Sequence, residues 1–185
     1  VTGGSRGIGR AIASMLRREG ARVRIVGRSA EVLAEAEALI NAEPPISDSP
    51  TVESIVADLA NPDDLRRLVD ELSGERLDIL VNNAGVAPNV RLEETSDEVW
   101  DLHFRVNVYA PFVLTRDLLP LLRKGSHPAI VNIGSVVSTQ GYIDQGAYTA
   151  SKHALLGFTK VLARELHGDG IRVFTVEPGG VATDM

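Results

Sequence analysis

A tyrosine and a lysine four positions apart have residue types and a spacing that suit proton-transfer chemistry. Tyr148 and Lys152 fall on one predicted helix, and this spacing puts both side chains on the same face, one turn apart. A free tyrosine has a pKa of about 10, and a neighbouring ammonium group favours the phenolate and lowers that pKa. Beside a bound cofactor, Tyr148 can give a proton to a carbonyl oxygen as hydride reaches the carbon. Facing solvent, the same pair is an ordinary surface pair without a role.

Two further polar residues have positions that suit the same reaction. Ser135 ends a predicted strand thirteen positions before Tyr148, and its hydroxyl can donate to a substrate oxygen or bond its own loop. Ser138 competes for that role. Asn107 lies among apolar residues inside a predicted helix, where an amide competes for backbone hydrogen bonds. It is either a satisfied buried amide or a functional residue.

A glycine-rich segment at residues 2–9 (TGGSRGIG) lies between a strand end and a helix. Glycines permit a tight turn and a close approach of the backbone to a pyrophosphate, and the helix N-terminus offers free N–H groups. Its spacing is Gly-x-x-x-Gly-x-Gly, which differs from the usual dinucleotide fingerprint. A turn without a ligand is the alternative. The predicted contacts are Gly3, Ser5, Arg6, Gly7, Ile8 and Gly9.

The end of the next strand indicates which nucleotide would bind. A site that prefers NAD would carry Asp or Glu there, to hold the ribose 2′-hydroxyl. Arg28 and Ser29 stand there instead, and Arg28 can pair with a 2′-phosphate and stack on the adenine. Arg6 lies in the glycine-rich turn and can reach the same phosphate. We therefore predict NADP(H) as cofactor, the alternative being two solvated surface arginines.

These residues need a sheet and helices that bring them to one edge. Short apolar runs alternate with helical stretches throughout the chain, which predicts an α/β fold with a doubly wound parallel sheet, Rossmann-like, in three α/β/α layers. We expect residues 1–185 to form a single NADP-binding domain, with Glu43–Pro50 as an exposed loop. Val1 would be the tail of an earlier strand. The predicted strands are Arg22–Gly27, Thr51–Ala57, Leu77–Val81, Ala129–Gly134 and Ile171–Val176, and the predicted helices are Gly7–Glu19, Ala30–Ala42, Pro62–Leu72, Asp97–Arg123 and Ala147–His167.

Local signals set some of the helix ends. Asn61 precedes Pro62 as a cap, and Ser96 or Thr95 would cap the long helix, which we expect to bend near Pro111. The segment 168–170 (GDG) is a helix stop.

Composition excludes several classes of site. The chain has no cysteine, so it has no disulfide, thiolate nucleophile or cysteine-based metal site, which suits the cytoplasm. A net charge of −6 argues against nucleic-acid binding, and no apolar run is long enough to span a membrane. The four histidines show no metal-ligand spacing, so we predict no metal and expect them near helix and loop surfaces. They are His103, His127, His153 and His167.

Taken together, these motifs resemble the short-chain dehydrogenase/reductase family, in its ordinary short branch. Segment 2–9 matches the family's TGxxxGxG motif and residues 82–85 its NNAG motif, while Asn107, Ser135, Tyr148 and Lys152 match its catalytic tetrad. The resemblance implies that Tyr148 is the proton donor and that Lys152 also holds the ribose hydroxyls. It implies that Asn107 holds a water connecting the lysine to solvent, and it selects Ser135 over Ser138.

The resemblance also implies contacts with the cofactor elsewhere in the chain. Asn83, Ala84 and Gly85 would line the cofactor side, while Asn82 mainly stabilises the sheet. After the third strand, Asp58 and Leu59 would lie at the adenine, although Asp58 can equally be a helix-entry residue. After the last strand, a PG motif would place its backbone and a threonine against the nicotinamide and phosphates. Its residues are Pro178, Gly179, Val181 and Thr183.

The function that the resemblance implies is NADP(H)-dependent interconversion of a carbonyl and an alcohol. The turn and residues 183–185 are similar to 3-oxoacyl-[acyl-carrier-protein] reductases, and a sphingoid-ketone reductase is another possibility. The alternative of another class is a non-catalytic NADP-sensing protein with this fold.

The resemblance carries two expectations beyond the reaction. Helices 97–123 and 147–167 would form the interface of a homodimer or homotetramer. The chain begins at what resembles a strand's last residue and ends after a glycine-rich turn, so we expect both ends to be truncated. The start of the first strand and the C-terminal elements around the substrate would then lie outside it.

Overall fold

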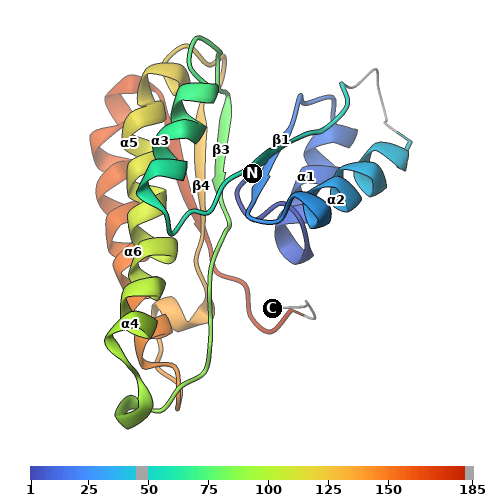
Figure 1. Cartoon of the computed structure of the whole chain (residues 1–185). Coiled ribbons are helices and arrows are strands. Elements are labelled where there is room, and N and C mark those ends of the chain that lie inside the picture. Colours follow the sequence, from blue (N-terminus) through green and yellow to red (C-terminus); the bar gives the residue numbers. More distant parts are fainter. Residues whose placement is uncertain (45–49, 182–185) are drawn as a thin grey trace.

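Five short parallel strands form the middle layer of the molecule (Figure 1). The computed structural model describes residues 1–44 and 50–181, so positions 45–49 of the expected loop and Thr183 lie outside the described residues. β1 pairs with β2, and β4 lies between β3 and β5, with every pairing parallel. The strands are β1 (Arg24–Gly27), β2 (Glu53–Val56), β3 (Ile79–Asn82), β4 (Ala129–Ile133) and β5 (Arg172–Val176).

The first two residues join these two groups of strands. The N–H of Thr2 donates to the carbonyl of Val81 over 2.9 Å, and the N–H of Val26 donates to the carbonyl of Val1 over 2.9 Å. Thr2 also forms a parallel bridge with Val26. Residues 1–2 therefore occupy the place of a central strand, which gives the order β2, β1, residues 1–2, β3, β4, β5.

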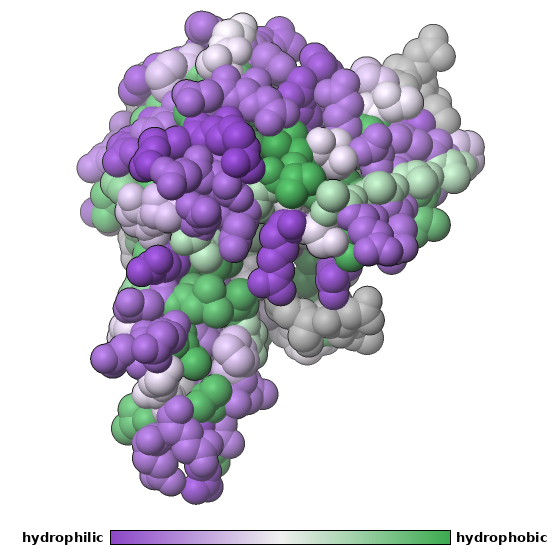
Figure 2. Space-filling model, in the orientation of Figure 1, coloured by the Kyte–Doolittle hydropathy of each residue, from purple (hydrophilic) through white to green (hydrophobic). Residues whose placement is uncertain are grey.

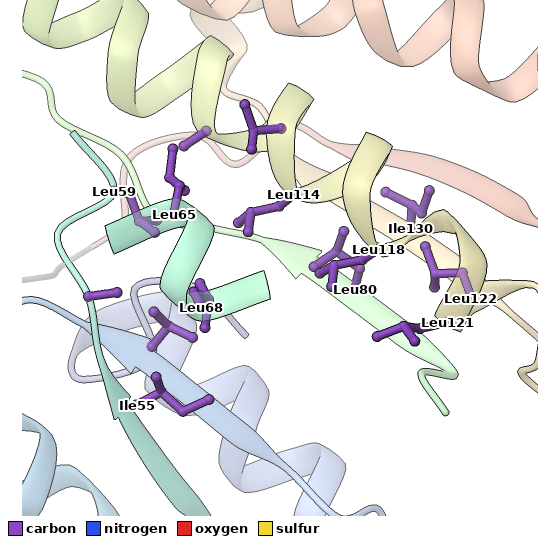
Figure 3. Packing of buried hydrophobic residues seen from close by; sticks show 14 of the residues in the cluster. Ile55, Leu59, Leu65, Leu68, Leu80, Leu114, Leu118, Leu121, Leu122 and Ile130 are labelled. Atoms are coloured by element: carbon purple, nitrogen blue, oxygen red, sulfur yellow. The ribbon is translucent and has the colours of Figure 1, made fainter. Parts of the chain in front are cut away.

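Helices cover the two faces of this sheet in separate sets (Figure 1). One apolar cluster packs Leu65, Leu114 and Leu162 of three helices against Leu80 and Ile130 of the strands (Figure 3). A second cluster packs α1 and α2 against the other face of β1. The three-layer, doubly wound α/β fold is thereby confirmed. The helices are α1 (Gly7–Arg18), α2 (Ala30–Ala42), α3 (Pro62–Glu71), α4 (Asp97–Phe104), α5 (Ala110–Leu122) and α6 (Gly146–Glu165).

The period of two along a strand explains how β1 serves both clusters. Ile25 belongs to the cluster with α1 and α2, whereas its neighbour Val26 belongs to the cluster with α3, α5 and α6. Successive side chains of a strand point to opposite faces, so one short apolar run contributes to two cores. Polar side chains cover most of the face seen in Figure 2, with apolar ones in smaller patches.

The predicted caps begin their helices as expected. The Asn61 Oδ1 accepts a hydrogen bond from the N–H of Asp63 over 2.9 Å, with Pro62 in the first turn of α3. Ser96, rather than Thr95, caps α4 through the N–H of Val99. Gly170 ends the turn after α6 with a φ of 71°, in the left-handed region that glycine tolerates.

The expected helix 97–123 is interrupted close to Pro111, near which we expected it to bend. A π-helical turn, Arg105–Tyr109, separates α4 from α5, and Pro111 lies at the start of α5. Proline has no N–H, so it removes a donor that a carbonyl of the preceding turn would otherwise use. Isolated π turns inside helices are frequent at functional sites, and Asn107 lies in this one.

β5 is the outermost strand of the sheet in the described part of the chain, and its Phe174 and Val176 each keep 47% of their surface exposed there. The other predicted strands and helices are confirmed, with ends that shift by one or two residues, because hydrogen-bonded pairing stops before the apolar pattern does.

Candidate functional site

The glycine-rich turn forms a cradle that side chains would fill. Gly3 has a φ of 63°, and a Cβ built on it would lie 2.9 Å from the Cα of Ala84. A Cβ on Gly9 would overlap the carbonyl of Gly3 and the amide of Asn83. α1 begins at Gly7, and the N-cap residue Arg6 provides no side-chain hydrogen bond to its first N–H groups. These N–H groups and the positive end of the helix dipole suit a phosphate.

Thr2 and Asn83 hold the cradle in place from the neighbouring strand. The hydroxyl of Thr2 accepts hydrogen bonds from the N–H groups of Asn83 and Ala84, both over 3.0 Å, and donates to the carbonyl of Val81. The Asn83 amide donates to the carbonyls of Thr2 over 2.9 Å and Gly3 over 3.2 Å. In this structure the Asn83 side chain therefore braces the turn.

Asn82 lies in a buried row of polar groups that crosses the sheet. Its amide donates to Oδ1 of Asn132 over 2.8 Å, and the Asn132 amide donates to the hydroxyl of Thr159 over 2.8 Å. The two asparagines are paired neighbours on β3 and β4. This geometry fits the expectation that Asn82 stabilises the sheet, and it ties β4 to α6.

The two arginines expected at a 2′-phosphate are both exposed. Arg6 lies in the turn before α1, and Arg28 follows β1 directly. Neither forms an ion pair with another residue in the part of the chain that the structure describes. Ser29 caps α2 by accepting a hydrogen bond from the N–H of Val32. No acidic side chain stands at the end of β1 to hold a ribose 2′-hydroxyl.

Asp58 and Leu59 have local roles of their own. The carboxylate of Asp58 accepts a hydrogen bond from the N–H of Ala60 over 3.0 Å, which forms the turn into α3. The Leu59 side chain is buried in the core, so only its backbone is available for contact with a ligand. This geometry agrees with the helix-entry alternative for Asp58 and leaves its exposed carboxylate accessible.

Lys152 is the buried cation of the site. Its side chain is only 4% exposed, and its Nζ donates a hydrogen bond to the carbonyl of Ile133 over 2.7 Å. Burial lowers the pKa of Lys152 to about 8, because the ammonium form loses its hydration. Nζ lies 5.8 Å from the centre of the Tyr148 ring. The last residue of β4, Ile133, thus holds the lysine one turn from the tyrosine.

Asn107 is fully buried and all of its amide groups are used. Its Oδ1 accepts from the N–H of Val86 over 2.9 Å, and its Nδ2 donates to the carbonyl of Val86 and to the hydroxyl of Ser151. Ser151 in turn donates to the carbonyl of Tyr148 over 2.8 Å. The π turn is therefore bonded both to the loop after β3 and to the helix that carries the tyrosine.

Gly85 is the point where Asn107 and Lys152 meet. A Cβ on Gly85 would lie 3.3 Å from Oδ1 of Asn107 and 3.7 Å from Nζ of Lys152. A glycine there leaves space beside the side-chain polar groups of Asn107 and Lys152. Three of the four predicted catalytic residues are thus brought together on α6 and the π turn.

The structure separates the two serine candidates. Ser138 is only 1% exposed, and its hydroxyl accepts a hydrogen bond from the N–H of Ser135 over 3.1 Å. Ser135 is half-buried and accepts from the N–H of Val137 at the start of a short 3₁₀ turn. Its O–H has no acceptor among the described residues, so it can donate to a ligand. The geometry thus favours Ser135.

Sequence reasoning missed Thr2 and Ser151, and it misplaced a histidine. Thr2 is the first residue of the glycine motif, and Ser151 lies one turn after Tyr148, so position alone marks both. His127, His153 and His167 are exposed as expected, but His103 is fully buried. The expectation for His103 was wrong because α4 packs its His103 face against Tyr148 of α6, at 6.4 Å between ring centres.

Within residues 1–44 and 50–181, no group of three His, Cys, Asp or Glu residues could hold a metal ion. In the same ranges, no helix is long and apolar enough to cross a membrane. The candidate cofactor contacts after β5 begin at the half-buried Pro178, followed by exposed Gly179 and Val181. The arrangement offers a phosphate cradle, a phenol, a buried ammonium group and a free serine hydroxyl along the carboxyl edge of one sheet.

The lowered pKa of Lys152 predicts a stability that depends on pH. Between about pH 8 and the ordinary lysine pKa of 10.5, the unfolded chain binds a proton at Lys152 that the folded chain does not, so stability rises with pH. Urea unfolding at pH 7.5, 8.5 and 9.5 should show the native protein gaining stability relative to Lys152→Met as pH rises. Lys160→Met removes an exposed lysine of α6, and because it keeps Lys152 it should gain stability with pH in parallel with the native protein. Parallel curves for native protein and Lys152→Met would contradict the assignment.

Comparison with known proteins agrees with this geometry. The family model described as short chain dehydrogenase matches residues 1–185. A short-chain type dehydrogenase/reductase of Picea abies is 42% identical over 100% of this chain and 70% of its own length. The 3-oxoacyl-[acyl-carrier-protein] reductase FabG of Escherichia coli (strain K12) is 38% identical over 100% of this chain and 73% of its own.

A solved structure shares the fold as well as the sequence. L-Sorbose reductase from Gluconobacter frateurii, complexed with NADPH and L-sorbose, has a TM-score of 0.91 and 34% identity, over 100% of this chain and 69% of its own. The motif order, the sheet and the relatives agree. The chain belongs to the short-chain dehydrogenase family.

Proposed function

We propose that the protein is an NADP(H)-dependent oxidoreductase that reduces a ketone or aldehyde to an alcohol, or catalyses the reverse reaction, with Tyr148 as acid and base. The observation that carries the proposal is the meeting of Lys152, Asn107 and Tyr148 at one end of α6. The uncapped start of α1 and the cradle of Gly3 and Gly9 fit a dinucleotide. These residues fit NADPH, the cofactor with which the related L-sorbose reductase was solved.

The bound cofactor supplies a hydride to the carbonyl carbon of the substrate. Tyr148 breaks its O–H bond and gives the proton to the carbonyl oxygen, which gains negative charge as hydride arrives. Ser135 donates its free hydroxyl to the same oxygen and stabilises that charge. The Lys152 ammonium stabilises the resulting phenolate. Asn107 and Lys152 lie together at Gly85, where a proton can return to Tyr148 from solvent.

The cofactor contacts extend along the same edge of the sheet. Gly3, Ser5 and the first turn of α1 would hold the pyrophosphate, Arg6 and Arg28 the 2′-phosphate, and Ser29 and Asp58 the adenosine. Ala84 lies beside the turn that Asn83 braces, and with Gly85 it would line the cofactor side. After β5, the backbone of Pro178, Gly179 and Val181 would contact the nicotinamide, as would Thr183, which lies outside the described residues. Residues 1–185 act as a single NADP-binding domain in this proposal, and a cytoplasmic location stays a prediction.

The substrate class stays open within the carbonyl compounds. The relative FabG is named for 3-oxoacyl-[acyl-carrier-protein], which favours an acyl thioester, and L-sorbose reductase favours a sugar. A sphingoid ketone is a further alternative. A non-catalytic NADP-sensing protein is the alternative of another class, and it would bind NADPH without oxidising it in the presence of any carbonyl compound.

Removing the phenol hydroxyl tests the mechanism. Tyr148→Phe should lower kcat by about a hundredfold to ten-thousandfold, the usual effect of losing a proton donor, and should leave NADPH affinity near the native value. The assay is NADPH oxidation against acyl-thioester, steroid, sugar and small-ketone panels. Tyr109→Phe removes an exposed hydroxyl and serves as control. A Tyr148→Phe enzyme with a near-native rate would exclude the mechanism, and native protein inactive on every panel would support the sensor.

Reversing the charge at Arg28 tests the choice of nucleotide. Hydrogen bonds to charged groups contribute about 1.5–3 kcal/mol, so Arg28→Asp should weaken NADPH binding about tenfold to a hundredfold. NADH binding should not weaken. Arg18→Asp makes the same change at an exposed site in the last turn of α1 and should leave NADPH affinity unchanged. Unaltered NADPH affinity in Arg28→Asp would contradict the assignment.

The protein also forms a homodimer or homotetramer through helices 97–123 and 147–167 in this proposal. Large apolar side chains are exposed on this part of the molecule, with Trp100 at 42%, Phe112 at 37% and Val161 at 50%. Phe112 also contacts Phe158, at 6.0 Å between ring centres, which makes α5 and α6 one apolar surface. Such surfaces usually mark interfaces.

Light scattering measures this directly. The native protein should have the mass of at least two chains at micromolar concentration, and Phe112→Asp should shift it toward one chain, because a buried unpaired charge opposes association. Glu35→Lys, at an exposed site of α2 outside these helices, is a charge-changing control expected to leave the mass unchanged. A native monomer at the same concentration would contradict the interface.

A further inference from the structure

His103 is a buried imidazole that the reaction scheme does not use. Its exposed fraction is 0%, and its ring packs against the ring of Tyr148 with 6.4 Å between centres and 57° between planes. Nδ1 lies 2.7 Å from the carbonyl oxygen of Val99, one turn earlier on α4. Nε2 is buried and has no hydrogen-bond partner among the described residues. A buried polar atom of this kind needs an explanation.

The contact with Val99 fixes which nitrogen carries the proton. A carbonyl oxygen only accepts, so Nδ1 must donate, and Nε2 of the neutral ring is left with a bare lone pair. In the tautomer that this bond selects, Nε2 of His103 is therefore an acceptor.

The position of His103 links it to the other groups of the site. It lies four residues before Asn107, so the two side chains share one face of α4 and the π turn. Asn107 contacts Ser151 of α6, and His103 contacts Tyr148, one turn earlier on that helix. The same seam between the two helices thus carries the asparagine, the tyrosine and a free acceptor.

Stability alone does not account for this histidine. A buried acceptor without a donor costs about 1–3 kcal/mol, whereas an apolar side chain of similar size would avoid that cost. Groups that lower stability without an evident structural return are concentrated at functional sites. The ring that carries this acceptor packs against the ring of the tyrosine that must lose and regain a proton in each turnover.

We propose that His103 is a positioning residue for Tyr148, and that its Nε2 accepts a hydrogen bond from a water molecule in the proton path between Tyr148 and Asn107. The ring holds the tyrosine from α4, and the acceptor orients the water that returns the proton. His103 itself transfers no proton. This inference rests on the proposed function, because it assigns a role in the same reaction.

Two amide variants separate the two nitrogens. In His103→Gln the side-chain oxygen reaches the distance of Nε2 from the backbone and keeps the acceptor. In His103→Asn the shorter amide stands near the place of Nδ1 and keeps only the bond to Val99. His103→Leu removes both. His153→Asn is a matched control, because His153 makes the same bond to the carbonyl four residues earlier but is exposed.

The expected results distinguish positioning from packing. His103→Asn and His103→Leu should lower kcat about tenfold, less than loss of the proton donor itself, with the KM for NADPH unchanged and the solvent deuterium isotope effect on kcat raised. His103→Gln should keep most of the activity and the native isotope effect. The thermal midpoint of His103→Leu should not fall, because an unsatisfied group has been removed.

Three outcomes would overturn the proposal. The first is a native kcat and isotope effect in both His103→Asn and His103→Leu. The second is an equal loss of activity in His103→Gln and His103→Leu. The third is a rate loss that only follows a loss of folding stability, which would leave His103 a packing role.

A spectroscopic measurement keeps this inference separate from the proposed function. The ¹⁵N spectrum of the native protein should show Nδ1 of His103 protonated and Nε2 unprotonated, with the Nε2 signal displaced toward the hydrogen-bonded range. A protonated Nε2, or an Nε2 signal at the position of a bare nitrogen, would overturn the proposal. Failure of the native protein to oxidise NADPH would instead count against the proposed function.

Discussion

The hydroxyl of Thr2 holds together the parts on which the rest of the site depends. It accepts two backbone N–H groups from the segment after β3 and donates to β3 itself, so one side chain uses its full hydrogen-bonding capacity across two strands. The backbone of the same two residues joins β1 to β3. Without this link the glycine cradle would belong to one half of the sheet and the catalytic groups to the other.

A second set of bonds carries this order from the sheet to the chemistry. Asn82 and Asn132 bond across β3 and β4, and Asn132 continues to Thr159 on α6. On the same helix, Lys152 donates a hydrogen bond to the carbonyl at the end of β4. Two buried hydrogen bonds, at Thr159 and at Lys152, thus tie the helix that carries Tyr148 to β4. Such bonds specify geometry more strictly than apolar packing does, because a buried polar group without a partner is costly. The burial that comes with this fixed position lowers the pKa of the Lys152 ammonium group.

The sequence was enough to predict most of the fold and to select the candidate site residues, for reasons that particular segments make clear. Apolar runs, Asn61 with Pro62 and the glycines at 168–170 are local signals, and local hydrogen bonding decides them. The same holds for the spacing of Tyr148 and Lys152, which a helix fixes by its pitch. The π turn at 105–109 could not be predicted in this way, because it depends on hydrogen bonds between Asn107 and two residues of other segments, Val86 and Ser151.

The exposure of residues was harder to anticipate, and His103 shows why. Burial depends on what packs against a segment, and neither composition nor periodicity identifies that neighbour. His103 belongs to a helix whose polar residues suggest a surface, yet it is fully buried where its ring packs against Tyr148 of α6. A polar residue in this situation keeps a free acceptor away from bulk water, and bulk water is the usual competitor for a hydrogen bond. A catalytic tyrosine gains most from an ordered proton path where that competitor is excluded.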